Sequence, residues 1–457
     1  MKTYDCLVLG GGPGGYLAAE RAAQRGMSVA VLEERAFGGV CLNEGCIPTK
    51  TLLHSAKMYR HATQSEAFGV TVEGMVHFSL PRAMERKRRV VQTLVGGVEN
   101  TLKHAGVEMV RARGTVLGRG TDGLFQVAAG DEQYVGKRLI VASGSHAAVP
   151  PITGVREGLA RGFVKTNREI LEIESLPRDL VVIGGGVIGL EMACFFAAVG
   201  VKVTVIEMLD QIAGNTDAEI ASVLQRTYEA QGMTFCLGAS VQRVENGAVV
   251  YQKDGKETTV PCDMVLLSTG RRPNTQDIGL ESINVQTQRG AIVTDLQLCT
   301  NVSGVWAVGD CNGKSMLAHT AYREAEVAVN HMCGEKDVVN YDSVPAVIYT
   351  DPEVACVGMT LQEAKQRGYA AREVKVPMQY AGRYVAEVDN GKGFCKLVLD
   401  ETSHRLLGVH MIGSYVSEMI YGAAMMVDTQ LPPARLQKLT FPHPTVSEVL
   451  REALFAL

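Results

Sequence analysis

The sequence predicts an α/β fold with two Rossmann-like dinucleotide-binding domains and a C-terminal α+β domain. Residues 5–34 and 179–208 each run from an apolar strand through Gly-x-Gly-x-x-Gly into a helix, and then into a second apolar strand that ends in glutamate. From about residue 342 the pattern changes to alternating apolar and polar residues with polar turns, as in antiparallel strands. These observations predict two similar units followed by a different third domain.

In the first unit, three glycines have separate expected roles. Gly10 permits the tight turn after the strand, Gly12 lets the backbone approach a pyrophosphate, and Gly15 lets the helix pack closely on the strand. Phosphate is expected at the helix N-terminus, where free N–H groups favour negative charge. Glu33 ends the second strand, where its carboxylate can accept hydrogen bonds from a ribose. The alternative is an ordinary glycine turn with a solvated carboxylate.

The second unit repeats this arrangement with Gly184, Gly186 and Gly189. Its strand-end carboxylate, Glu207, would repel the 2′-phosphate of NADP, so this unit is predicted to bind NAD. A solvated charge remains the alternative for either glutamate alone, but the same residue in the same register of both units favours the binding role.

Strand ends also suggest where the domains meet. Residues 139–154 form an apolar strand followed by small residues and a proline-rich connector, and residues 264–274 form a similar strand end. A further strand at residues 305–310 carries Asp310 at its tip.

The composition excludes several classes of function. With 45 basic and 49 acidic residues, the net charge of −4 gives no electrostatic footprint for nucleic acid or an anionic membrane. No segment approaches the ~20 apolar residues of a membrane helix. Eleven cysteines among 457 residues are too sparse for a secreted disulfide scaffold, which favours a reducing cytoplasm. Small molecules and proteins are therefore the expected partners.

Residues 39–50, GVCLNEGCIPTK after Gly38, contain two cysteines, Cys41 and Cys46. By spacing alone they could bridge to each other, help to hold a metal, or fill a core as small apolar side chains. No second cysteine or histidine pair at ligand spacing supports a metal. Pro48 suits the first turn of a following helix, whose N–H groups would lower a thiol pKa.

These motifs in this order resemble the FAD-dependent pyridine nucleotide-disulfide oxidoreductases of class I, the glutathione reductase type, and within them the dihydrolipoamide dehydrogenases. The resemblance covers essentially the whole chain. It rests on the following stretches: GGGPGG, GGVCLNEGCIPTK, GGGVIGLE, STGRRPN, VWAVGDC, LAH and FPHPTVSE.

The resemblance implies that the first unit binds FAD, the second binds NAD, and the third domain forms a homodimer. Cys41 and Cys46 would be the redox-active disulfide, with Cys46 against the flavin and Cys41 exchanging with substrate. The implied domains are an FAD-binding domain in two parts (1–150 and 270–342), an NAD-binding domain (151–269) and a dimerisation domain (343–457).

The resemblance also implies further cofactor contacts, including an ion pair between Lys50 and Glu191 near the flavin. Residues matching FAD contacts are Gly10, Gly12, Gly14, Gly15, Glu33, Lys50, Gly114, Ser143, Gly144, Asp310, Met316, Leu317, Ala318 and His319. Residues matching NAD contacts are Gly184, Gly186, Gly189, Glu191, Glu207, Val241 and Gly270.

The segment FPHPTVSE supplies the implied acid-base residue, His443. Pro444 biases it to an extended backbone, and an imidazole with a near-neutral pKa can take a proton from a dithiol and return it. In the family, the residue matching Glu448 orients this histidine. Alternatively, Thr445 and Glu448 form a helix capping box.

Three positions depart from the usual family pattern. Val40 and Glu44 replace threonine and a small apolar residue, and Phe441 replaces a histidine. Glu44 would raise the pKa values of the cysteines if it faced them, and would change little if it faced solvent.

The expected activity is NAD-dependent oxidation of a protein-bound dihydrolipoyl group, as the shared component of a 2-oxoacid dehydrogenase or glycine cleavage complex. The lipoyl-bearing protein would be its partner. The alternatives are an NAD(P)H-dependent disulfide reductase of glutathione reductase type and a non-catalytic flavin-binding subunit.

Overall fold

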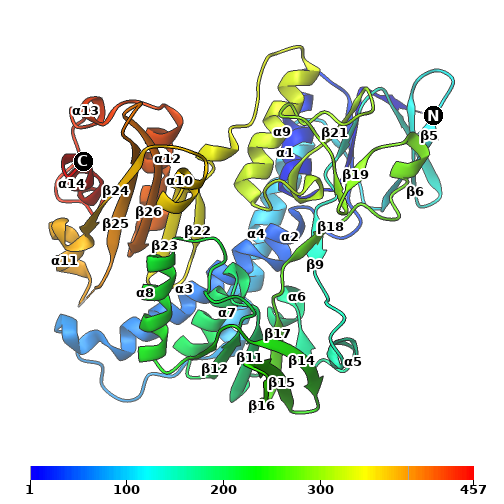
Figure 1. The fold of residues 1–457 in the computed structure, drawn as a ribbon. Helices are drawn as coiled ribbons and strands as arrows, with labels where there is room; N and C mark the ends of the chain where they lie inside the picture. Colours follow the sequence, from blue (N-terminus) through cyan, green and yellow to red (C-terminus); the bar gives the residue numbers. More distant parts are fainter. Residues whose placement is uncertain (1, 390) are drawn as a thin grey trace. The chain divides into compact units, whose positions relative to one another are not determined.

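The computed structural model describes residues 2–389 and 391–457 (Figure 1), and the chain divides into two compact units. Unit 1 comprises Met1–Thr51, Pro81–Ala148 and Gly270–Val339, and unit 2 comprises Leu52–Leu80, Val149–Thr269 and Asn340–Leu457. The three implied domain boundaries stay predictions.

Unit 1 is built on a five-stranded parallel sheet in the order β21-β8-β2-β3-β4. Its central strands are short, apolar and fully buried, as expected when both faces of a parallel sheet are covered. Helices α1 and α9 lie side by side against it (Figure 1). The elements are β2 (Cys6–Leu9), α1 (Pro13–Gln24), β3 (Val29–Leu32), β4 (Glu108–Val110), β8 (Leu139–Val141), β21 (Val305–Ala307) and α9 (Ala318–Met332).

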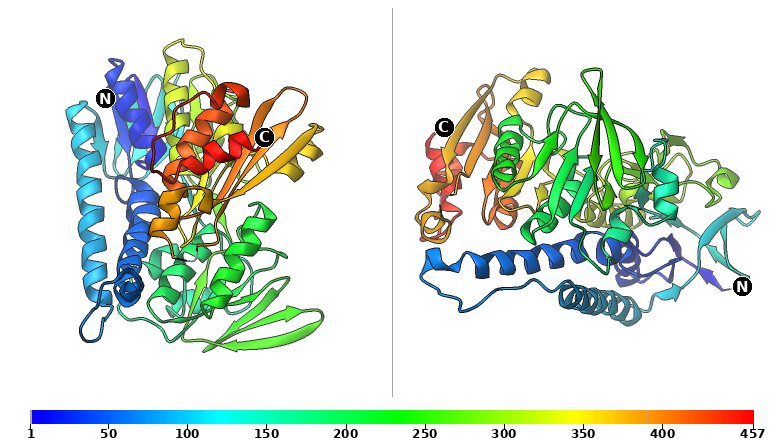
Figure 2. Two further views of the ribbon diagram at one scale, coloured as in Figure 1. Left: turned by 90° about the vertical axis from the view of Figure 1, so that its left-hand side faces the viewer. Right: turned by 90° about the horizontal axis from the view of Figure 1, so that it is seen from below.

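A second sheet in unit 1 has the order β1-β7-β6-β5, and small strand pairs complete the unit. These strands are β1 (Thr3–Tyr4), β5 (Gly114–Arg119), β6 (Phe125–Ala129), β7 (Glu132–Gly136), β9 (Ser145–Ala147), β18 (Arg271–Pro273), β19 (Thr287–Gln288) and β20 (Ala291–Ile292). Helix α2 (Gly39–Glu44) precedes α3 (Cys46–Thr63), and α4 (Leu80–His104) is the long helix seen in Figure 2.

Unit 2 contains the second parallel sheet, in the order β10-β17-β11-β12-β13. An antiparallel sheet, β14-β15-β16, accompanies it and is drawn in green in Figure 2. The elements are β10 (Val164–Lys165), β11 (Asp179–Ile183), α7 (Val187–Ala198), β12 (Lys202–Ile206), α8 (Ala218–Ala230), β13 (Thr234–Cys236), β14 (Ser240–Glu245), β15 (Ala248–Lys253), β16 (Lys256–Pro261) and β17 (Met264–Leu267), with α5 (Val155–Ala160) and α6 (Asn167–Ile170). The repeated strand, glycine turn and helix predicted from the sequence are thus β2–α1–β3 and β11–α7–β12.

The C-terminal part of unit 2 is a five-stranded antiparallel sheet, β22-β23-β26-β25-β24, as the alternating sequence predicted. One face packs its apolar side chains against α12 and α14. The elements are β22 (Ala346–Ile348), β23 (Glu353–Gly358), α10 (Leu361–Gln366), β24 (Ala371–Pro377), α11 (Gly382–Glu387), β25 (Phe394–Asp400), β26 (Arg405–Gly413), α12 (Val416–Asp428), α13 (Pro433–Leu436) and α14 (Glu448–Phe455).

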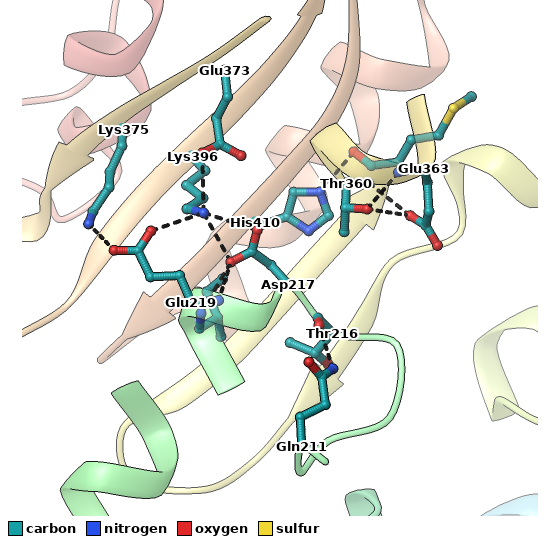
Figure 3. A network of polar contacts seen from close by, with 12 residues as sticks. Gln211, Thr216, Asp217, Glu219, Thr360, Glu363, Glu373, Lys375, Lys396 and His410 are labelled. Atoms are coloured by element: carbon teal, nitrogen blue, oxygen red, sulfur yellow. Dashed lines mark hydrogen bonds and ion pairs between the residues drawn. The ribbon is translucent and has the colours of Figure 1, made fainter. Parts of the chain in front are cut away.

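The opposite face of this sheet carries a buried polar network (Figure 3). Lys396 on β25 is buried, and its Nζ lies 3.0 Å from Asp217, 3.1 Å from Glu219 and 3.2 Å from Glu373. Asp217 is also the N-cap of α8 and accepts from two backbone N–H groups of that helix. The network therefore joins the start of α8 to the C-terminal sheet.

Across the part of the chain that the structure describes, no helix is long and apolar enough to span a membrane.

Candidate active site

The first and third glycines of each turn cannot carry a side chain. Gly10 and Gly184 have φ of +108° and +103°, and a Cβ there would lie 2.2 and 2.5 Å from a carbonyl oxygen of the neighbouring strand end. A Cβ on Gly15 or Gly189 would lie 1.8 or 2.2 Å from the oxygen of the first glycine. The turn and the close start of the helix both depend on glycine, as the sequence predicted.

The middle glycines face open space instead. A Cβ on Gly12 would meet only Gly39 Cα, at 3.7 Å, and a Cβ on Gly186 would meet nothing within 4 Å. Gly12 and Gly186 are the N-cap residues of α1 and α7, and no side chain caps either helix. Both helix starts therefore present backbone N–H groups at an open cradle, which fits a pyrophosphate.

The two strand-end carboxylates are held in the same way. Glu33 accepts from the Gly11 N–H at 2.7 Å, and Glu207 accepts from the Gly185 N–H at 2.6 Å. Each accepts a second backbone N–H two residues further along, at 2.8 Å. Both acceptors are thus fixed beside their glycine turns, where a ribose hydroxyl is expected.

The cysteine pair lies where α2 gives way to α3. Cys41 is within α2, and Cys46 is the first residue of α3, as predicted. Both are thiols in this structure. The hydrogen bond with Cys46 and burial raise the pKa of Cys41, whereas the charge of Lys50 acts in the opposite direction. The lowering of a thiol pKa by the start of α3 stays a prediction, because Cys41 lies before that helix and its pKa is raised mainly by the hydrogen bond with Cys46 and by burial.

Glu44 forms an ion pair with Arg35. Its side chain is only 14% exposed, so it does not face solvent, and its charge beside the thiols is paired. The pKa of Cys41 is determined mainly by Cys46, by burial and by the charge of Lys50. Pairing with Arg35 therefore reduces the effect of the acid between the two cysteines.

Two tyrosines that the sequence analysis missed adjoin this pair. The hydroxyls of Tyr16 on α1 and Tyr322 on α9 lie 2.6 Å apart. Burial raises the pKa of both hydroxyls, and the charge of Cys41 contributes to each shift. Tyr16 directly follows the first glycine motif, but no local pattern connects it with a residue 306 positions away.

Asp310 lies in the turn after β21, as predicted. Its carboxylate accepts a hydrogen bond from Ser145, and Arg271 lies 3.8 Å from it while donating to the same serine hydroxyl at 2.7 Å. The fully buried Glu324 accepts from the Gly309 N–H at 2.6 Å and so fixes the turn that carries Asp310. Sequence reasoning missed these supporting residues, although the two stretches containing Ser145 and Arg271 had been recognised as strand ends.

The remaining predicted flavin residues also lie in unit 1. Gly114 faces Leu9, and Ser143 donates to the Asn274 carbonyl oxygen at 2.5 Å. The other predicted flavin residues lie at turns and helix starts: Gly14 in α1, Gly144 with φ +70°, and Met316, Leu317, Ala318 and His319 at the start of α9. Gly270, which was predicted for NAD, has φ +105°. Val241 lies in unit 2, on β14 beside a bulge.

Lys50 and Glu191, the implied ion pair, belong to different units. Glu191 is buried on α7 and accepts from the Tyr349 N–H at 3.0 Å. Its pairing with Lys50 stays a prediction.

His443 and Glu448 form a pair in unit 2. His443 Nδ1 lies 2.9 Å from Glu448 Oε1, and Glu448 Oε2 accepts from the Thr445 N–H at 3.0 Å. The His443 hydrogen bond is the main cause of the lowered pKa of Glu448. Because the carboxylate is ionised at neutral pH, Nδ1–H donates to it and Nε2 is left as the acceptor.

The capping alternative holds only in part. Helix α14 begins at Glu448 with Ser447 as its N-cap, so Thr445 caps no helix, although its N–H does bond to Glu448. The imidazole is 76% exposed in the single chain, which suits a group that meets a substrate. Phe441 packs against the apolar cluster of the C-terminal domain.

These features together are those of a nucleotide-dependent thiol oxidoreductase. Two cradles fit dinucleotides, a pair of adjacent thiols can carry two electrons, and a carboxylate-oriented imidazole can carry a proton.

Comparison with known proteins identifies the family. The family model described as pyridine nucleotide-disulphide oxidoreductase matches residues 4–325, and the model of its dimerisation domain matches residues 344–454. The chain belongs to this family and carries its dimerisation domain. The family depends on FAD and a pyridine nucleotide, and the cofactors of this chain are FAD and NAD.

Relatives and solved structures agree over the full length. The chain is 35% identical to dihydrolipoyl dehydrogenase of Mycoplasma pneumoniae over 99% of both chains, and 36% identical to that of Bacillus subtilis over 99% of this chain and 98% of the relative. Among solved structures, LpdA of Mycobacterium tuberculosis has a TM-score of 0.89 at 25% identity, and the match covers 100% of this chain and 99% of LpdA. The HOCl-induced flavoprotein disulfide reductase RclA of Escherichia coli, solved as a Cu(II) complex, has a TM-score of 0.87 at 26% identity, and the match covers 100% of both chains.

Proposed function

We propose that the chain is a dihydrolipoyl dehydrogenase, which oxidises a protein-bound dihydrolipoyl group to the cyclic disulfide and reduces NAD. The observation that carries the proposal is the His443–Glu448 pair at 2.9 Å, because dithiol oxidation needs a base for each of two thiol protons. The full-length similarity to dihydrolipoyl dehydrogenases supports the same substrate.

In the proposed reaction, His443 acts on the substrate bound at the cysteine pair of the other copy in a homodimer. Nε2 takes the proton of one substrate thiol, and Glu448 stabilises the imidazolium through Nδ1–H. The substrate sulfur attacks Cys41 of the oxidised pair, so that the Cys41–Cys46 bond breaks and a mixed disulfide forms.

The imidazolium then gives its proton to solvent, and Nε2 takes the proton of the second substrate thiol, whose sulfur attacks the substrate sulfur bonded to Cys41. The bond to Cys41 breaks, the cyclic disulfide leaves and Cys41 takes the proton from the imidazolium, so the cysteine pair holds the two electrons with Cys41 protonated and Cys46 as the thiolate. The raised pKa of Cys41 supports this distribution, because its main cause is the hydrogen bond with Cys46. Bound FAD supplies the two-electron chemistry that links the cysteine pair to NAD.

Several residues of the chain serve binding rather than electron transfer. The open helix start at Gly186 receives the NAD pyrophosphate, and Glu207, fixed by the Gly185 N–H, accepts a ribose hydroxyl and disfavours NADP. The predicted setting is the cytoplasm, with the lipoyl-bearing protein of a 2-oxoacid dehydrogenase or glycine cleavage complex as partner.

A second candidate is an NAD(P)H-dependent disulfide reductase. The similarity to RclA over the full length favours it. So does the departure from the usual residues at Val40, beside Cys41, and at Glu44, between the two cysteines.

One pair of steady-state assays separates the candidates. Dihydrolipoamide with NAD or NADP is compared with glutathione disulfide and other disulfides in the presence of NADH or NADPH. We expect NAD reduction by dihydrolipoamide to be the fastest reaction. Activity confined to disulfide reduction would reject the first proposal in favour of the second, and a protein that releases no FAD on heating would reject both.

A further inference from the structure

A cysteine outside the candidate active site contacts an imidazole. Cys299 Sγ lies 3.4 Å from His331 Nδ1, and the Trp306 indole N–H donates to the same nitrogen at 3.3 Å. Cys299 and Trp306 also form a β-bridge, which holds the strand ends in this position. Since Nδ1 accepts the indole proton, it is unprotonated and can accept the proton of the thiol as well.

Cys299, Trp306 of β21 and His331 of α9 line one pocket of about 490 Å³ in unit 1. This volume lies within the range of small-molecule sites. Cys299 and His331 are both half-buried, so that the sulfur is accessible through the pocket.

The same pocket is strongly basic. Arg119, Lys137 and Arg138 line it, and no aspartate or glutamate belongs to its lining in the described residues. Lys137 is paired with Asp5 at 2.8 Å, whereas Arg119 and Arg138 form no ion pair with any described carboxylate. The pocket is therefore suited to a ligand that carries carboxylates.

We propose that Cys299 is a site of thiol–disulfide exchange with small anionic disulfides, with glutathione disulfide as the probe. The three cations hold carboxylates of the disulfide, and His331 serves as the base for the thiol. This site is independent of the active-site cysteines and of the proposed function.

The exchange is balanced without a further reactant. His331 Nδ1 takes the Cys299 proton, the sulfur attacks one sulfur of the disulfide, and a new S–S bond forms as the old one breaks. The second sulfur leaves as a thiolate and takes the proton from the imidazolium. Cys299 is oxidised, one half of the disulfide is reduced, and the disulfide itself is the oxidant.

The need for a base follows from the surroundings of the thiol. Burial, and then the charge of Asp295, raise the pKa of Cys299, so the resting group is protonated. Asp295 accepts from the Cys299 N–H at 2.9 Å and stays close to it. Without His331 the thiolate fraction would be too small for rapid attack.

The test uses the FAD-loaded dimer with its active-site pair oxidised, incubated with glutathione disulfide at pH 7.5 and mapped by peptide mass spectrometry over time. Cys333 is the internal control, because it is exposed and lies just after α9. We expect Cys299 to be modified about ten times faster than Cys333 despite its lower exposure, since attack is assisted by a base. Equal or slower modification at Cys299 would overturn the proposal.

Two variants separate the roles of base and charge. His331→Gln keeps an acceptor for the indole N–H but cannot take a proton, and should slow modification at Cys299 about tenfold while leaving Cys333 unchanged. Arg138→Gln should slow the modification of Cys299 by glutathione disulfide but not its modification by the neutral hydroxyethyl disulfide. An unchanged rate of Cys299 modification in His331→Gln would refute the role of His331 as the base. An equal slowing of both disulfides in Arg138→Gln would refute the proposed binding of the disulfide carboxylates. The wild-type comparison stands even if a variant fails to fold.

Discussion

Replacing Lys396 by methionine should destabilise unit 2 far more than the same change at Lys375. Both lysines pair with Glu219, but the Lys396 side chain is 6% exposed and that of Lys375 is 44% exposed. Removal of Lys396 leaves three carboxylates facing one another, for which a cost of about 3–5 kcal/mol is typical of a broken buried pair. Loss of the exposed Lys375 pair should cost less than about 1 kcal/mol.

The expected difference is measurable as a shift in Tm. At about 2–4 °C per kcal/mol for a body of this size, Lys396→Met should lower Tm by roughly 6–20 °C and Lys375→Met by less than about 4 °C. The assay is thermal unfolding followed by circular dichroism at saturating FAD and pH 8, with both variants and the wild type at one protein concentration.

The pH dependence of the difference has a defined sign. Burial would lower the pKa of Lys396, but hydrogen bonds to Asp217 and Glu219 outweigh it and the pKa is raised. The stabilisation from Lys396 is therefore complete below its unfolded pKa and is lost only as pH rises through the raised folded value. In Lys396→Met the clustered carboxylates protonate more readily, so the deficit should shrink from pH 8 to pH 5.

A buried imidazole beside the network adds a pH dependence of its own. Burial lowers the pKa of His410 against the charges of Asp217 and Glu373, so its contribution to stability falls as pH falls below its unfolded value. Equal Tm losses for the two lysine variants, or a deficit that grows at pH 5, would refute the reasoning.

Three further predictions concern the site. Gly186→Ala should fold normally, because its Cβ meets no protein atom, yet raise the KM for NAD about tenfold or more by filling the phosphate cradle; a changed Tm with an unchanged KM would contradict this. Glu448→Gln should lower kcat with dihydrolipoamide about 10–100-fold but spare NADH-dependent dye reduction, because it affects only the imidazolium of His443; an equal loss in both assays would show a structural effect instead. Arg35→Met should raise the pKa of the cysteine pair, followed by thiolate absorbance, because the Glu44 charge loses its partner, and adding Glu44→Gln should reverse the change.

The sequence predicted best those features that depend on neighbours along the chain. Both glycine turns, their strand-end glutamates and the start of α3 at Cys46 follow from short motifs, because each turn is closed by residues within about 25 positions. The role of Glu44 could not be predicted, since its side chain could turn either way and only the fold places Arg35 against it.

Other contacts were missed because they join distant segments. Tyr16 meets Tyr322 from 306 residues away, and Lys396 meets Asp217 from 179 residues away. An alternating strand pattern shows that Lys396 and its apolar neighbours point to opposite faces, but it does not show what covers the polar face. Lys396 therefore looks like a solvent-facing charge until the position of α8 is known.

The contact between Asp217 and Lys396 connects the C-terminal sheet with the predicted NAD site. Asp217 caps α8, and the loop before it begins at Glu207, the carboxylate fixed by the Gly185 N–H. One carboxylate thus both orders the helix start and binds the buried cation, at 3.0 Å with each oxygen. Because the loop between Glu207 and Asp217 is held at both ends, the C-terminal sheet helps to fix the loop that follows the predicted ribose-binding carboxylate. Losing Lys396 should therefore weaken NAD binding as well as stability, whereas losing Lys375 should leave NAD binding unchanged.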